Sequence, residues 1–287
     1  MPASRAKARI RQSEADDDIE GSGSATVETA SIPDEWLIVT LELILSITVI
    51  ALLVGFLVGS VGVGGVLLPP ALTYFGGMDI HLAMATSMFS FLFTGAVGTT
   101  IYSRRRSVDW RMVGWLALGV TPAALLGARS NALLSADILT TILAVIVIGS
   151  GIQALFKSSS RHDRACVLSA RSLVCIGIGV GFGSALSGTG GPILLVPVLL
   201  MIGVHPLSAI AASQVVQLPI ALSATVGYLL YGQVHLMLGL LCGPIAMLGV
   251  VMGASLAHWL PATALRRIVA GALIVAGAMI LLERLAS

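Results

Sequence analysis

Two stretches of the chain, GFLVGSVGVGGVLLPP at residues 55–70 and GFGSALSGTGGPILLV at residues 181–196, share four of their five glycine positions, a Gly-Phe pair and a Gly-x-Gly-Gly break. A shift of 126 residues aligns them, and the alignment runs without a gap from Ser46 to Leu155. Other identical pairs are Ser87 and Ser213, Tyr102 and Tyr228, and Gly127 and Gly253. A hydrophobic chain of two similar halves is typical of membrane transporters, whose binding site tends to form where the repeats meet.

The composition indicates that most of this chain lies in a membrane. Of its 287 residues 56% are hydrophobic and only 10% are charged, and the mean hydropathy is +0.98. Soluble domains carry about 25% charged residues. The three cysteines, Cys166, Cys175 and Cys242, show no disulfide or metal-ligand spacing, so we expect neither a metal site nor a cofactor.

The N-terminal tail, residues 1–35, differs from the rest of the chain. It contains four basic and eight acidic residues, a net charge of −4, whereas the remaining chain nets +6 from twelve basic and six acidic residues. The tail has no apolar segment of the kind found in signal peptides. Its composition predicts a disordered, acidic segment.

Ten apolar runs follow the tail, and eight of them approach or exceed the about 20 residues that span a bilayer as a helix. The runs at 64–77 and 190–203 are shorter, follow the glycine breaks, and end at Gly77 and Gly203. The sequence therefore predicts an all-α, polytopic transmembrane bundle of two homologous repeats, with eight full-length helices and two short, glycine-broken ones. The other runs are 36–59, 82–103, 110–128, 134–156, 172–187, 207–230, 235–256 and 262–282.

This pattern gives a first repeat at 36–156, a basic linker at 157–171, and a second repeat at 172–287. Arginines crowd both the linker and the loop at 104–111, so both should face the cytoplasm. Two topologies remain open. If the short helices do not cross the membrane, the repeats are parallel; if they cross, each half spans five times and the repeats are inverted.

Charged and catalytic groups are scarce in the apolar segments. Beyond the tail the six acids lie at or near segment ends, and no Lys or Arg lies at mid-membrane depth. Cation pathways normally need such charges, whereas a helix N-terminus can hold an anion with backbone N–H groups alone. No histidine is placed to act as a base for a nucleophile, so we do not expect an enzyme.

The predicted binding site combines the two glycine breaks with the polar side chains nearest to them. Gln214 and Gln217 lie three residues apart on one helix face and should point toward protein or a water-filled path rather than lipid. Two alternatives remain for this set: the glycines and small residues serve only helix packing, and the hydroxyls bond within their own helices. The set is Gly62, Gly64, Gly65, Ser87, Ser184, Ser187, Gly188, Thr189, Gly190, Gly191, Ser213, Gln214 and Gln217.

At these residues the chain resembles the sulfite exporter TauE/SafE family, also called the 4-toluene sulfonate uptake permease family. The resemblance rests on both Gly-x-Gly-Gly breaks and on the stretch from Tyr102 to Arg111, and it covers residues 46–284. It implies a multi-pass inner-membrane permease for small sulfur-containing or organic anions. Val66 and Pro192 stand where the family often has a third glycine, which leaves the ligand open.

The sequence as a whole predicts a secondary transporter that moves a small anion, a sulfur oxyanion, an organosulfonate or an organic acid, across the cytoplasmic membrane by alternating access. Its expected partners are that anion and membrane lipids, with no nucleic acid. An anion channel, or a non-catalytic membrane subunit that requires a partner, is the alternative. The oligomeric state does not follow from the sequence.

Overall fold

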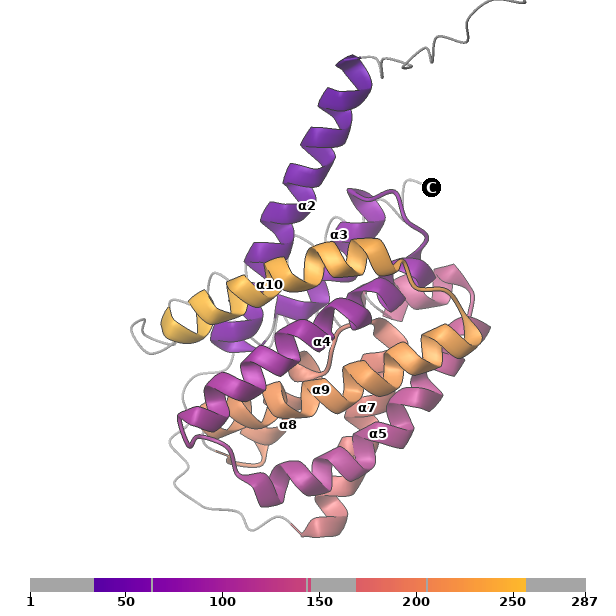
Figure 1. Cartoon of the computed structure of the whole chain (residues 1–287). Coiled ribbons are helices and arrows are strands. Elements are labelled where there is room, and N and C mark those ends of the chain that lie inside the picture. The colour runs from indigo at the N-terminus through magenta and orange to yellow at the C-terminus, as the bar shows by residue number, and fades with distance from the viewer. Residues whose placement is uncertain (1–33, 63, 143, 146–168, 205, 257–287) are drawn as a thin grey trace, which may run out of the picture. The chain divides into compact units, whose positions relative to one another are not determined.

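The computed structural model describes residues 34–62, 64–142, 144–145, 169–204 and 206–256. By its internal contacts the chain divides into residues 1–40 and 41–287, and the description below concerns the second unit. All regular secondary structure in the described ranges is helical, as the sequence predicts (Figure 1). In chain order these are α2 (Asp34–Val61), η1 (Gly64–Leu67), α3 (Leu68–Tyr74), α4 (Ile80–Arg104), α5 (Trp110–Leu133), α7 (Ala170–Ser187), α8 (Pro192–Met201), α9 (Pro206–Tyr231) and α10 (Leu236–Leu256).

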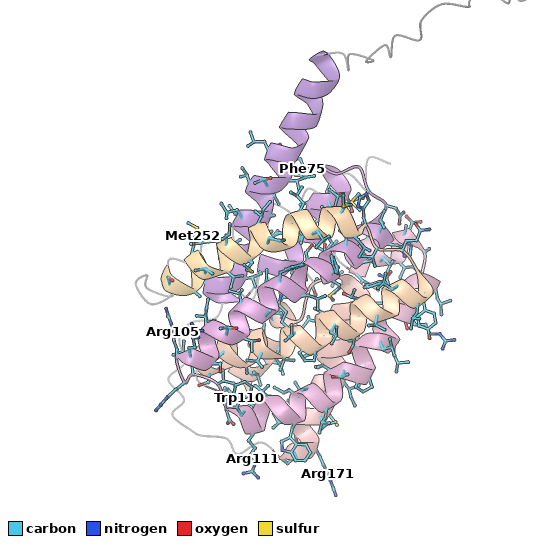
Figure 2. The ribbon with its side chains drawn as sticks, in the orientation of Figure 1. Phe75, Arg105, Trp110, Arg111, Arg171 and Met252 are labelled. Carbon is cyan, nitrogen blue, oxygen red and sulfur yellow. The ribbon has the colours of Figure 1, made fainter. Side chains whose placement is uncertain are left out.

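Within the described residues, five helices are long and apolar enough to cross a membrane, and residues 45–60 of α2 form a further, shorter apolar helix. Their outer faces carry large exposed hydrophobic side chains, such as Leu118, Leu229 and Met237. Met252 also projects outward from α10 (Figure 2). Apolar surface spread over most of the helices matches a lipid environment better than water. The five helices are Ile80–Arg104, Trp110–Leu133, Ala170–Ser187, Leu207–Tyr231 and Leu236–Ser255.

The two short segments are helical and stay short, as predicted. The first contains a 3₁₀ turn, η1, followed by α3 with seven residues, and the second contains α8 with ten. Of the predicted run at 134–156, residues 136–142 and 144–145 are helical. The rest of that run, the run at 262–282, nearly all of the N-terminal tail and most of the basic linker lie outside the described residues.

The two halves exchange helices, in the sense that a helix of one half packs against a helix of the other. Glycines bring α2 close to α10, since a Cβ atom on Gly55 would overlap the backbone of Ala246. They also bring α5 close to α7, where a Cβ on Gly181 would lie 2.6 Å from the carbonyl oxygen of Val120. Each residue of the second contact lies 126 positions from its counterpart in the first. The same correspondence relates Gly253 with Phe56 to Gly127 with Phe182.

A pair of tyrosines repeats this correspondence inside each half. The Tyr102 hydroxyl on α4 donates to the carbonyl oxygen of Gly59 at 2.9 Å, near the end of α2. The Tyr228 hydroxyl on α9 donates to the carbonyl oxygen of Ala185, near the end of α7. Both tyrosines are buried. Each bond ties the last turn before a glycine break to the long helix that follows the short one, α4 in the first half and α9 in the second.

The directions of the helices follow from which residues meet. Gly95 on α4 packs against Leu218 on α9, and Gly98 packs against Gln214, so these two equivalent helices run antiparallel. By contrast, Gly55 and Gly59 on α2 meet Ala246 and Val250, so α2 and α10 run parallel. The pair α5 and α7 is parallel in the same way, with Gly119 near Gly177 and Gly127 near Ala185.

The parallel course of α5 and α7 places their N-terminal ends together. Arg111 at the start of α5 and Arg171 at the start of α7 extend outward from this common end (Figure 2). The loop that carries Arg104, Arg105 and Arg106 leads into it. The arginine-rich loop and the end of the linker therefore share a side, which agrees with the placement predicted from their charge.

Candidate functional site

The candidate site begins where α2 and α7 end. Gly62 follows α2 with φ of 78°, and Gly188 caps α7 in the left-handed region with φ of 68°. Residues with a side chain rarely adopt these angles, so glycine is what lets both helices stop abruptly here. The next helix in the second half begins at Pro192, which suits the first helical turn because its missing N–H needs no partner there.

The two breaks meet in the interior of the unit. A Cβ on Gly65 would lie 2.6 Å from the carbonyl oxygen of Thr189, and one on Gly62 would lie 3.6 Å from Cβ of Pro192. All six candidate glycines and Thr189 are buried. The break residues of the two halves, far apart in sequence, therefore form one buried neighbourhood.

The ring of Phe91 on α4 lies against both breaks. A Cβ on Gly190 would lie 2.7 Å from Cδ2 of this ring, and one on Gly65 would lie 3.2 Å from its Cζ. Phe91 is fully buried. Phe91 is not among the residues predicted from the sequence. The repeat alignment nevertheless pairs it with Gln217, which is among them.

The two glutamines turn toward protein, as the sequence predicts. Nε2 of Gln214 donates to the carbonyl oxygen of Val58 at 2.7 Å, and Nε2 of Gln217 donates to Oγ1 of Thr94 at 2.8 Å. Val58 is in the last turn of α2, and Thr94 is near the middle of α4. The side-chain oxygens Oε1 of both glutamines are buried and have no hydrogen-bond partner.

Most of the predicted hydroxyl groups bond within their own helix. Ser87 donates to Ala83 O at 2.7 Å, Ser187 to Gly183 O at 2.7 Å, and Ser213 to Ile210 O at 2.8 Å. Ser213 nevertheless lies beside the first break, with its Oγ 3.5 Å from a Cβ on Gly62. Ser87 has no contact with a break among those described. A hydroxyl that bonds back to its own helix keeps its lone pairs, so it can still accept a hydrogen bond.

Ser184 differs from the other hydroxyls. Its Oγ is fully buried without a hydrogen-bond partner, and it lies 3.8 Å from a Cβ on Gly191. Ser184 also accepts the backbone N–H of Thr189 through its carbonyl oxygen at 3.1 Å. Its hydroxyl is therefore an unused donor and acceptor next to the second break.

The buried polar side chains among the described residues are all uncharged, and no group of three His, Cys, Asp or Glu residues in those ranges has a metal-binding arrangement. The site is made of backbone amides, hydroxyls and amide side chains. Such neutral dipoles can hold an ion of either sign, and amides at a helix N-terminus favour an anion.

The helices and the buried polar junction define the class of this protein as an integral, multi-pass helical membrane protein. Comparison with known families gives the same class and makes it specific. Residues 44–280 match the family described as "Sulfite exporter TauE/SafE", and the chain belongs to that family. It is therefore a member of a membrane transporter family, as the resemblance in its sequence implies.

Relatives with curated names carry the same general description. The chain is 24% identical to the probable membrane transporter protein YunE of Bacillus subtilis (strain 168) over 239 residues, which cover 72% of this chain and 88% of YunE. It is 24% identical to the probable membrane transporter protein YdhB of the same organism over 233 residues, covering 77% and 93%. MJ0441 of Methanocaldococcus jannaschii, also a probable membrane transporter protein, is 26% identical over 189 residues, covering 55% and 68%. No solved structure matches the chain significantly.

Proposed function

We propose that this protein is a secondary transporter that carries a small anion across the cytoplasmic membrane and binds it between the two glycine breaks. The observation that carries the proposal is the contact between the breaks, in which Gly65, at the start of η1, adjoins Thr189, shortly before α8. The first N–H groups of a helix have no partner within it, so the starts of η1 and α8 beside this contact would favour negative charge.

Helix directions support alternating access between two inverted repeats. The equivalent helices α4 and α9 run antiparallel, which is expected when a two-fold axis in the membrane plane relates the halves. An axis along the membrane normal would make them parallel. The paired contacts between α2 and α10 and between α5 and α7 fit the same two-fold relation. One half rocking against the other would then expose the site to each side in turn.

The candidate ligands are small sulfur oxyanions, organosulfonates and short organic acids. The family name mentions sulfite export, and the site offers only neutral hydrogen-bonding groups, which bind a small anion without trapping it as a buried arginine would. A conducting channel, or a subunit that requires a partner, remains the competing function. Purified protein in proteoliposomes separates them, because a transporter shows counterflow and a lone subunit shows no flux.

Ser184→Ala tests the site with little risk to folding. The hydroxyl has no partner, so its removal should leave the unfolding midpoint in detergent unchanged or slightly raised. If Ser184 contacts the anion, the KM for uptake of the best substrate should rise about three- to tenfold.

Thr225→Val is the matched control for this experiment. Its Oγ1 is also buried and unpartnered, but it lies two turns along α9 from Gln217 and has no described contact with a break. It should leave the KM at the wild-type value. An unchanged KM in Ser184→Ala, or an equal rise in both variants, would remove Ser184 from the site.

A further inference from the structure

We propose that the transported anion also carries a hydrogen-bond donor, such as a hydroxyl or ammonium group, which meets the side-chain oxygens of Gln214 and Gln217. This inference rests on the proposed function, because it concerns the ligand of the same site. Oε1 of Gln214 and Oε1 of Gln217 have no hydrogen-bond partner, and the two residues are 0% and 1% exposed.

The hydrogen bonds of the two amide nitrogens fix which end of each side chain is free. Nε2 of Gln214 faces the carbonyl oxygen of Val58, which can only accept, so the amide cannot be turned around. Nε2 of Gln217 faces Oγ1 of Thr94, whose own hydrogen goes to the carbonyl oxygen of Phe91 at 3.2 Å. The free atoms are therefore oxygens, which a bound ligand must approach with a donor.

Both amides are linked to the residues that line the breaks. The carbonyl oxygen of Val58, which holds Gln214, also accepts the N–H of Gly62 at 3.0 Å. Thr94, which holds Gln217, bonds to Phe91, whose ring lies against Gly65 and Gly190. Through these shared partners both amides are connected to the break residues, and Oε1 of Gln214 itself lies against Gly98 on α4, where an added Cβ would overlap it. An anion without a donor would leave both oxygens unpaired, and buried unpaired acceptors are costly.

The acceptors belong to one half only. The equivalent positions in the first half, 126 residues earlier, are Met88 and Phe91, which are fully buried and have no side-chain oxygen. The ligand would therefore be oriented, with its donor toward α9. A bound hard cation explains the oxygens less well, because such ions surround themselves with about six or more oxygens, whereas the described residues offer two unpartnered amide oxygens.

The test compares anions that differ only in a donor. The purified full-length protein in proteoliposomes is offered two pairs in competition: ethanesulfonate with 2-hydroxyethanesulfonate, and propionate with 2-hydroxypropionate. In at least one pair the wild type should favour the hydroxylated member by about tenfold or more in kcat/KM. Gln214→Met, which introduces the equivalent residue of the first half, and Gln217→Met, which removes the side-chain oxygen, should bring this ratio toward one.

Thr225→Val again serves as the control, since it removes a buried unpartnered hydroxyl of α9 away from the breaks and should keep the wild-type ratio. Equal transport of both members of each pair would overturn the inference and leave the proposed function standing. Transport of none of the four anions would overturn the inference, and it would overturn the proposed function as well if sulfite and thiosulfate, offered in the same assay, are also not transported. A ratio that persists in both glutamine variants, or falls equally in Thr225→Val, also contradicts the inference. If neither glutamine variant folds, the wild-type ratio alone decides.

Discussion

Single hydrogen bonds decide how the ends of α2 and α7 are held. Tyr102 and Tyr228 occupy equivalent positions, and each donates to a carbonyl oxygen three residues before a glycine break, at Gly59 and Ala185. The repeat alignment pairs the two tyrosines, but the sequence gives no partner for either hydroxyl. The partner depends on how α4 lies on α2, which is a property of the packed unit.

Tyr102→Phe and Tyr228→Phe should each lower the free energy of unfolding by about 1 kcal/mol, because each leaves a buried carbonyl oxygen without its donor. Equilibrium unfolding in detergent, followed by circular dichroism, measures both. Since the two bonds are equivalent, the two losses should agree within about 0.5 kcal/mol. A variant that loses nothing would show that its hydroxyl bond is absent in solution.

Helix pairs in this protein approach closely through glycine. On α7, a Cβ on Gly177 would lie 2.5 Å from the carbonyl oxygen of Leu116 on α5. Gly179, two residues further on, is exposed and would meet nothing within 4 Å. The two glycines look alike in the sequence, and only the position of α5 separates a packing glycine from a free one. In membranes, where hydrophobic attraction between helices is weak, such close approach is a main source of stability.

Gly177→Ala should therefore destabilise the protein by about 2 kcal/mol or more, since backbone atoms of α5 cannot move aside without separating the helices. Gly179→Ala is the matched control and should be neutral or stabilising by up to about 1 kcal/mol, through higher helix propensity. Unfolding midpoints measured in one detergent should be lower for Gly177→Ala than for Gly179→Ala. Equal midpoints would contradict the packing of α5 on α7.

The sequence predicted the helices well, but it did not predict which side chains contact one another between them. Lengths of the apolar runs and the glycine breaks located η1, α3 and α8, because a bilayer and a helix have fixed dimensions. The hydroxyl groups were ambiguous, and Ser87, Ser187 and Ser213 proved to bond within their own helices. The amide nitrogens of Gln214 and Gln217 bond across helices, which no local pattern specifies. Phe91 was missed because an apolar ring in an apolar run carries no signal of its own.

At the scale of the whole molecule, the antiparallel course of α4 and α9 favours the proposed inverted repeats over parallel ones. It predicts that the loop between α4 and α5 and the loop between α9 and α10 face opposite sides of the membrane. Ser107 and Gln233 are equivalent positions in these loops, 126 residues apart.

Ser107→Cys and Gln233→Cys, in a background with Cys166, Cys175 and Cys242 replaced, should react with a membrane-impermeant thiol reagent from opposite sides. Sealed vesicles of known orientation, labelled before and after permeabilisation, provide the measurement. Because cytoplasmic loops are rich in arginine and lysine, we expect Ser107, next to Arg106, to face the cytoplasm. Labelling of both residues from one side would indicate parallel repeats and exclude rocking of inverted halves.

The exchange of helices between the halves has a consequence for how the chain is made. While the ribosome delivers it into the membrane, α2 emerges first, yet the surface that Gly55 and Gly59 prepare is filled only by α10, nearly two hundred residues later. Until α10 has been made, the glycine face of α2 lacks its packing partner. The packing of α2 on α10 can therefore form only after α10 has been synthesised, and the first half alone would leave Gly55 and Gly59 without this partner.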